Sequence, residues 1–322
     1  MTIWLWQEGI MGNNACSPSS ETMQNLFSVA QNGGIIPDIS LDMAVNGYLS
    51  LKSRTVLTNH YDAIQQRLST EQLALFNQNL TSTFGGTKVT SGNIGIVALA
   101  LSLFLDVVSN DIMGQTTPDP VQRMLGTSDS SIGSIIGEYL RKVPELVNNG
   151  EGMADITELC DQELKFELID LFERMTLQRQ LNSRAIKLWL NGAVIHLHVR
   201  IHGIRLGSVP LGSAESLRLS YSTAFTSLVR RYTGYLRRYI KEMPPPTRTQ
   251  APGLLVIEPS RNVSHWVRHS PCESESIENA IMTQIIAAQH IQSSEDYLEN
   301  LAKKIILLVR QRSNFELKKK EV

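Results

Sequence analysis

The sequence predicts an all-α protein, a multi-helix bundle with a long central apolar helix and a strapped C-terminal helical hairpin. Apolar residues recur at the three- and four-residue spacing of amphipathic helices along most of the 322 residues. Residues 94–105, IGIVALALSLFL, form the one long apolar run, in which Ser102 is the sole polar member. No internal repeat is present, which argues against a solenoid. A chain of this length can bury a large core in one or two domains.

Helical segments follow one another along the chain, separated by turns rich in glycine, proline and small polar residues. Their expected ranges are about 19–30, 41–68, 69–84, 92–109, 128–143, 153–181, 184–206, 213–243, 275–292 and 295–316. Ser69 and Gln72 have the spacing of a capping box, in which two side chains satisfy backbone amides of the first turn. Within residues 184–206, the stretch from Ile195 to Ile201 also alternates as a strand does, but the apolar stripe of the whole segment continues over five turns and favours a helix.

Three segments describe the expected domain organisation. Residues 1–243 form the main helical bundle. Residues 244–253, PPPTRTQAPG, form a linker, because three consecutive prolines cannot continue a helix and prefer an extended conformation. Residues 254–322 form an extended strap plus the C-terminal helical hairpin, and LLVIEP near the start of this segment is either a single strand or part of the strap.

The apolar run has two interpretations. A helix over 92–109, capped by Thr90 or Ser91, is apolar on nearly all sides, which is typical of a central core helix or of a membrane-inserted one. Spanning a bilayer takes about 20 apolar residues, and a run of about 10–14 more often forms a core helix or an interfacial segment. A buried core helix is the simpler interpretation, and a stored membrane-active segment is the functional hypothesis. The candidate membrane-segment residues are Ile94, Ile96, Val97, Leu99, Leu101, Leu103, Phe104 and Leu105.

A basic aromatic helix is expected over 213–243. Its candidate basic surface consists of Arg230, Arg231, Arg237, Arg238 and Lys241, with tyrosines interleaved. Such a face suits an anionic membrane surface. Alternatively, the tyrosines pack inward while the arginines pair with the acidic helix at 151–173. Nucleic acid is a less suitable partner, because phosphate contacts dominate nucleic-acid affinity and the net charge of the chain is only -1.

His198 and His202 are the only residues with metal-ligand spacing. On a helix their i, i+4 separation places both imidazoles on one face, whereas on a strand His196 would share that face with them. No third ligand stands at a recognisable spacing. We therefore expect no metal and no cofactor, and we expect these histidines to have a structural role with sensitivity to pH.

No sequence motif indicates catalysis. Neither a GxSxG element nor a P-loop occurs, and Cys160 lies among acidic residues that raise a thiol pKa. The sequence therefore predicts a protein that is not an enzyme. Three cysteines do not suggest a disulfide framework and favour a reducing compartment. The N-terminal residues lack the features of a signal peptide, so the expected location is cytoplasmic or peripheral to a membrane.

A helical body with one sequestered apolar segment resembles helical pore-forming proteins in general architecture. The leading functional hypothesis is membrane association through residues 92–109 and the basic helix 213–243, with an anionic lipid membrane and a homo-oligomer as candidate partners. The alternative is an intracellular helical scaffold or adaptor that uses exposed helix faces and the proline-rich segment 244–253 as a docking point.

Overall fold

A computed structural model describes residues 19–32, 39–89, 94–116, 119–126, 130–178, 180–243, 253–258, 263–268 and 277–317. Helices dominate these residues and the strands are few and short, so the expected all-α multi-helix bundle is confirmed. Residues 1–18, the predicted capping residues Thr90 and Ser91 and the proline-rich residues 244–252 lie outside the described residues.

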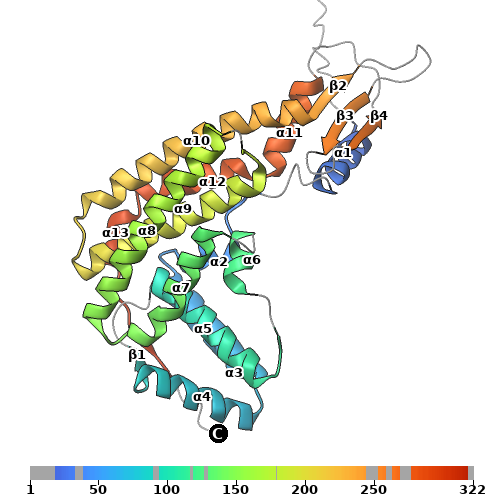
Figure 1. Ribbon diagram of the computed structural model, residues 1–322. Coiled ribbons are helices and arrows are strands. Elements are labelled where there is room, and N and C mark those ends of the chain that lie inside the picture. Colours follow the sequence, from blue (N-terminus) through green and yellow to red (C-terminus); the bar gives the residue numbers. More distant parts are fainter. Residues whose placement is uncertain are drawn as a thin grey trace, which may run out of the picture. The chain divides into compact units, whose positions relative to one another are not determined.

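Thirteen helices and five strands lie in this part of the chain (Figure 1). The helices are α1 (Ser20–Asn32), α2 (Met43–Tyr48), α3 (Ser53–Arg67), α4 (Thr70–Phe84), α5 (Ile96–Ile112), α6 (Pro120–Leu125), α7 (Ser131–Leu146), α8 (Gly150–Thr176), α9 (Ser183–Leu206), α10 (Gly212–Tyr239), α11 (Ile277–Ala288), α12 (Ile291–Ala302) and α13 (Ile305–Arg310). The strands are β1 (Lys88–Val89), β2 (Ile240–Met243), β3 (Gly253–Glu258), β4 (Val263–Arg268) and β5 (Phe315–Glu316).

The chain divides into two compact units, each assembled from segments that are distant in sequence. One unit combines residues 1–37 with 233–288, and the other combines residues 38–232 with 289–322. The expected domain segments, 1–243, 244–253 and 254–322, are consecutive in sequence, whereas both units join the N-terminal part of the chain to its C-terminal part.

The unit of residues 1–37 and 233–288 contains a small antiparallel sheet in the order β2-β3-β4, and α1 contacts β3 and β4 (Figure 1). The basic helix expected to reach residue 243 ends at Tyr239, which corrects that boundary. Of the two alternatives for LLVIEP, a strand or part of a strap, the structure shows a strand, because residues 253–258 form β3, the central strand of the sheet. These residues form strands because successive side chains of a strand point to opposite faces of the sheet. Pairing of β2 with β3 therefore places Ile240, Leu254 and Val256 on the same face, where all three are fully buried.

A glycine permits close packing on this sheet. A Cβ atom on Gly253 would lie 2.4 Å from the Trp266 ring, which is closer than any side chain allows. The indole of β4 therefore rests against a bare backbone position of β3.

The unit of residues 38–232 and 289–322 holds the main helical core. Helix α5 packs against α3 and α7, with smaller contacts to α2, α4 and α9, while α8 and α9 lie side by side (Figure 1). A cluster of buried apolar residues joins α9, α10, α12 and α13, and its members are Leu197, Ile201, Ala214, Leu301, Ile305 and Leu308. The chain end closes this unit through β5, which pairs with β1 in the register Val89↔Phe315.

Local sequence signals agree with several helix boundaries. The capping box of Ser69 and Gln72 is present at the start of α4, and Gly85 ends that helix in the left-handed conformation. The segment 184–206, which also fitted a strand, is the helix α9. The helix expected over 295–316 is instead divided into α12 and α13 by a turn at Lys303 and Lys304, and its last residues form β5.

Candidate functional site around helix α9

The predicted apolar run lies in the core. Six of its candidate residues on or just before α5 have at most 2% of their surface exposed: Ile94, Ile96, Val97, Leu99, Leu101 and Leu105. The other two, Leu103 and Phe104, are partly exposed and line a cavity of about 500 Å³ together with Val107. In the part of the chain that the structure describes, no helix is long and apolar enough to cross a bilayer.

The N-terminus of α5 is held by a side chain from α9. Arg205 donates a hydrogen bond from Nε to the carbonyl oxygen of Leu308 at 2.9 Å, and one from Nη1 to that of Ile94 at 3.5 Å. Gly95, the N-cap of α5, has φ 60° and ψ -127°, and a Cβ atom there would lie 3.2 Å from Arg205 Nη1. Only glycine combines this backbone conformation with so close a guanidinium.

Arg205 is a cation whose charge is poorly compensated. None of the ion pairs among the described residues involves Arg205, and its buried Nη2 atom has no hydrogen-bond partner. Burial, together with the nearby charge of Arg312, lowers the pKa of Arg205 to about 10. The amino end of α5, which Arg205 approaches, also carries positive partial charge from the helix dipole. The guanidinium therefore depends on backbone carbonyls for its stabilisation.

The two predicted histidines lie on the same helix as Arg205, one and two turns before it. His198 is 1% exposed and His202 is 3% exposed. His198 Nε2 lies 3.2 Å from the hydroxyl of Tyr297 on α12, while His198 Nδ1 and both ring nitrogens of His202 have no hydrogen-bond partner. Burial, and secondarily the charge of Arg205, lowers the pKa of each histidine to about 3. Both imidazoles are therefore neutral at pH 7.

Several groups on neighbouring helices determine the charge around these histidines. Tyr139 of α7 interacts electrostatically with Arg205, and burial raises the pKa of this tyrosine. Burial also raises the pKa of Tyr297, so both phenols are neutral. Arg312, after α13, adds a second positive charge near Arg205. No described carboxylate contributes to the pKa shift of His198, His202 or Arg205, so a proton taken up by either histidine would face cations.

Another histidine of α9, His196, has a different environment. Its Nε2 atom lies 3.2 Å from Asp161 Oδ1 of α8, and its Nδ1 atom contacts the hydroxyl of Tyr221 on α10. Arg200 donates two hydrogen bonds to Asp161, at 2.5 and 2.7 Å. Burial raises the pKa of Asp161, but the hydrogen bonds from His196 and Arg200 outweigh it and the net shift is downward. This network joins α8, α9 and α10 through a compensated charge pair.

The described residues contain no cluster of three histidine, cysteine or acidic side chains that could hold a metal ion. His198 and His202 do share one face of a helix, as the sequence predicted, but His198 already contacts Tyr297. Cys160 is a buried free thiol, and burial followed by the charges of Asp161 and Glu163 raises its pKa. The thiol is therefore protonated at neutral pH and is not set up as a nucleophile.

The predicted basic residues are exposed. Arg230 and Arg231 belong to one unit, and Arg237, Arg238 and Lys241 belong to the other. Arg231 donates to the backbone of Thr176 and Arg237 to the side chain of Asn279, rather than to acidic residues of α8. Tyr232 and Tyr235 are buried, which agrees with the alternative in which the tyrosines pack inward.

Sequence reasoning identified the histidines but missed their polar neighbours. Arg205 lies three residues after His202 and could have been found by continuing the same helical face by one turn. The pair of Asp161 and Arg200 carries no local signal, because 39 residues separate its members and no spacing rule relates two different helices.

No family model, curated protein or solved structure matches this chain. The class of protein is therefore defined by its fold, an all-α multi-helix bundle that includes a small antiparallel sheet.

Proposed function

We propose that the protein associates with anionic membranes and that acid promotes this association by weakening the contact between α9 and the start of α5. The observation that carries the proposal is the row of His198, His202 and Arg205: both histidines are buried, no described carboxylate contributes to the pKa shift of any of the three, and Arg205 donates to the backbone at Ile94. Protonation of either imidazole would add a positive charge beside an arginine that is already poorly compensated.

The expected size of this effect is sufficient to loosen the fold without unfolding it. A histidine whose folded pKa is about 3 and whose unfolded pKa is near 6.5 disfavours folding by about 2 kcal/mol at pH 5. Two such histidines contribute about 4 kcal/mol, compared with about 5–15 kcal/mol of stability for a typical domain. Acid alone is therefore expected to increase local opening around α5, which a membrane could then trap.

A membrane could accept α5 only near its surface. When α5 leaves the core and enters lipid, its apolar side chains stay out of water, so most of the free energy gained by burying them is retained. Asp106, Asn110 and Asp111 on the same helix favour the headgroup region. An interfacial position is therefore proposed in place of a spanning one. The exposed Arg230, Arg238 and other basic residues of the α10–β2 segment would add attraction to anionic lipids, which salt should screen.

Vesicle co-sedimentation tests this proposal. Wild-type protein should bind phosphatidylserine-containing vesicles more strongly at pH 5.0 than at pH 7.5, and bind phosphatidylcholine vesicles weakly at both. Replacing both histidines, as His198→Gln/His202→Gln, should reduce the difference between the two pH values. Equal binding at both pH values, or no binding to either vesicle, would exclude the acid-promoted mechanism.

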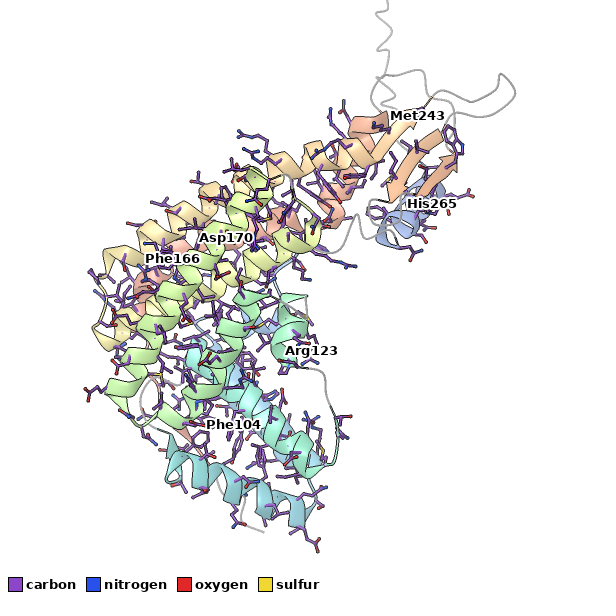
Figure 2. The ribbon with its side chains drawn as sticks, viewed as in Figure 1. Phe104, Arg123, Phe166, Asp170, Met243 and His265 are labelled. Carbon is purple, nitrogen blue, oxygen red and sulfur yellow. The ribbon has the colours of Figure 1, made fainter. Side chains whose placement is uncertain are left out.

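A second candidate function, a helical interaction module, is supported by the outer face of α8. Leu159 and Phe166 are 53% and 69% exposed and lie two turns apart on one stripe of this helix, and Leu177, its C-cap residue, is 73% exposed. Figure 2 marks Phe166 and, one turn later, Asp170 on α8. An apolar stripe with flanking carboxylates suits an amphipathic partner helix that carries basic residues.

The stripe can be tested with a basic amphipathic peptide and isothermal titration calorimetry. Phe166→Ser should weaken peptide binding, whereas Leu219→Ser, at an exposed leucine of α10, should not. Equal effects of the two substitutions would argue against a specific docking face on α8.

A further inference from the structure

A groove separates the α2 region from the helices α12 and α13, within the unit of residues 38–232 and 289–322. Its volume is about 530 Å³, in the range of sites that bind small organic molecules. One wall comes from residues 40–52 and the other from one face of α12 and α13, where Tyr297, Leu301 and Leu308 recur at helical spacing. The groove is thus an elongated depression along a helix, and α12 alone is about 18 Å long.

The groove offers apolar side chains along its length. Leu41, Leu49 and Leu51 line the first wall, and Leu301 and Leu308 line the second. Leu49, Leu301 and Leu308 are at most 3% exposed, so they belong to the packed core and form a fixed apolar base. A site of this shape can cover an alkyl chain, and each methylene removed from water contributes about 0.8 kcal/mol.

Two lysines line the groove together with these leucines. Gln311 donates a hydrogen bond to the carbonyl oxygen of Leu51 at 2.9 Å, so the turn that carries Lys52 lies beside the residue that follows α13. Lys304 precedes α13 by one residue and lines the same groove. Within the described residues neither lysine forms an ion pair, and both are exposed. The single carboxylate of the groove, Asp296, lies on α12 more than two turns before Lys304 and accepts a hydrogen bond from Gln292 at 3.0 Å.

A buried polar atom also lines the groove. Ser294, in the first turn of α12, is 1% exposed, and its hydroxyl has no hydrogen-bond partner. A buried hydroxyl left unpaired costs free energy that a polar ligand atom can recover. The groove therefore combines an apolar base, a buried unpaired hydroxyl and two exposed lysines that form no ion pair among the described residues.

We propose that this groove binds a single-chain amphipathic anion, with the alkyl chain on the leucines and the anionic head held by the lysines that line the groove, Lys52 and Lys304. Charge complementarity selects this occupant, because the two lysines favour an anion over a neutral or cationic head, and the leucines favour a ligand with an alkyl chain over a bare anion. Tyr297 lines the groove and contacts His198, so an occupied groove would adjoin the histidine row. The inference does not depend on membrane association and can be tested in the absence of vesicles.

The test uses isothermal titration calorimetry of the full chain at pH 7.5 with monomeric dodecyl phosphate, kept below its micelle concentration. The proposal expects saturable binding of one molecule per chain. Lys52→Gln/Lys304→Gln should weaken binding about tenfold, since each partly solvated charge contact contributes up to about 1 kcal/mol. Lys303→Gln, which replaces an exposed lysine next to Lys304 that does not line the groove, should leave binding unchanged.

Two further titrations separate the parts of the ligand. Inorganic phosphate alone should bind far more weakly than dodecyl phosphate, because it lacks the chain. Dodecyl maltoside should also bind more weakly, because its head is neutral. Absence of saturable binding, equal affinity for the neutral amphiphile, or equal losses in the double variant and in Lys303→Gln would overturn the proposal. Because all titrations are done at neutral pH without lipid bilayers, their failure would leave acid-promoted membrane association unaffected.

Discussion

Replacing the two histidines of the α9 row should flatten the dependence of stability on pH. The perturbation is His198→Gln/His202→Gln, which keeps a neutral polar side chain at both positions and removes the titration. In the wild type, the unfolded chain takes up protons on these histidines below pH 6.5, whereas the folded chain takes them up only near pH 3. Lowering the pH between these values therefore favours the unfolded state.

The magnitude follows from the two pKa values. At pH 5.0 the unfolded pKa lies about 1.5 units above the pH, and each unit corresponds to about 1.4 kcal/mol, so each histidine contributes about 2 kcal/mol. Between pH 7.5 and pH 5.0 the free energy of unfolding should fall by about 4 kcal/mol more in the wild type than in the double variant. His198→Gln alone should give about half of that difference.

Urea denaturation followed by circular dichroism at both pH values measures this difference. His290→Asn is the matched control, because His290 is an exposed histidine with φ 55°, a conformation that asparagine tolerates. The control should retain the pH dependence of the wild type. If the double variant and the wild type lose equal free energy between pH 7.5 and pH 5.0, the neutral, buried state of these imidazoles is refuted.

Three further substitutions test individual contacts, each by urea denaturation at pH 7.5. Gly95→Ala should lower the free energy of unfolding by about 3 kcal/mol, because alanine is unfavourable in this backbone conformation and its Cβ atom would lie close to the Arg205 guanidinium. Gly85→Ala is the control: it has a similar φ of 66° but no atom within 4 Å of its Cβ position, and it should cost about 1 kcal/mol. Asp161→Asn should cost about 3 kcal/mol by leaving Arg200, whose side chain is only 16% exposed, without its carboxylate partner. Asp170→Asn, in a more exposed i,i+4 pair, should cost less than about 1 kcal/mol, and equal costs would contradict this difference in burial. Ser69→Ala should cost about 1 kcal/mol by removing the capping box of α4, and no measurable change would show that this cap does not stabilise the unit.

Features encoded within a few residues were predictable from the sequence. The capping box at Ser69 and the helical character of 184–206 depend on local spacing, and both are found. The position of the run from Ile94 in the core also followed from its uniform apolarity. These signals were reliable because helix caps and periodicity act over one or two turns.

Features that depend on tertiary pairing were not predictable. Residues 240–243 continue a helical pattern but form β2, because Ile240 pairs with Val256 of a strand that follows the proline-rich segment. In the same way, Lys52 and Lys304 meet at one groove although they are far apart in sequence. A single sequence contains no rule that brings such distant residues together, since packing overrides local propensity.

The most direct test of acid-promoted membrane association follows the environment of α5. Val107 is 56% exposed on this helix, and Val107→Cys labelled with the fluorophore NBD, in a chain that also carries Cys16→Ser and Cys272→Ser, reports whether its surroundings become apolar. With phosphatidylserine vesicles at pH 5.0, the emission should shift to shorter wavelength and increase, while a label at Leu159→Cys on α8, which is similarly exposed, should change little. A label on α5 that reports water at pH 5.0 with vesicles present would contradict the proposed insertion and leave α5 as a permanent core helix.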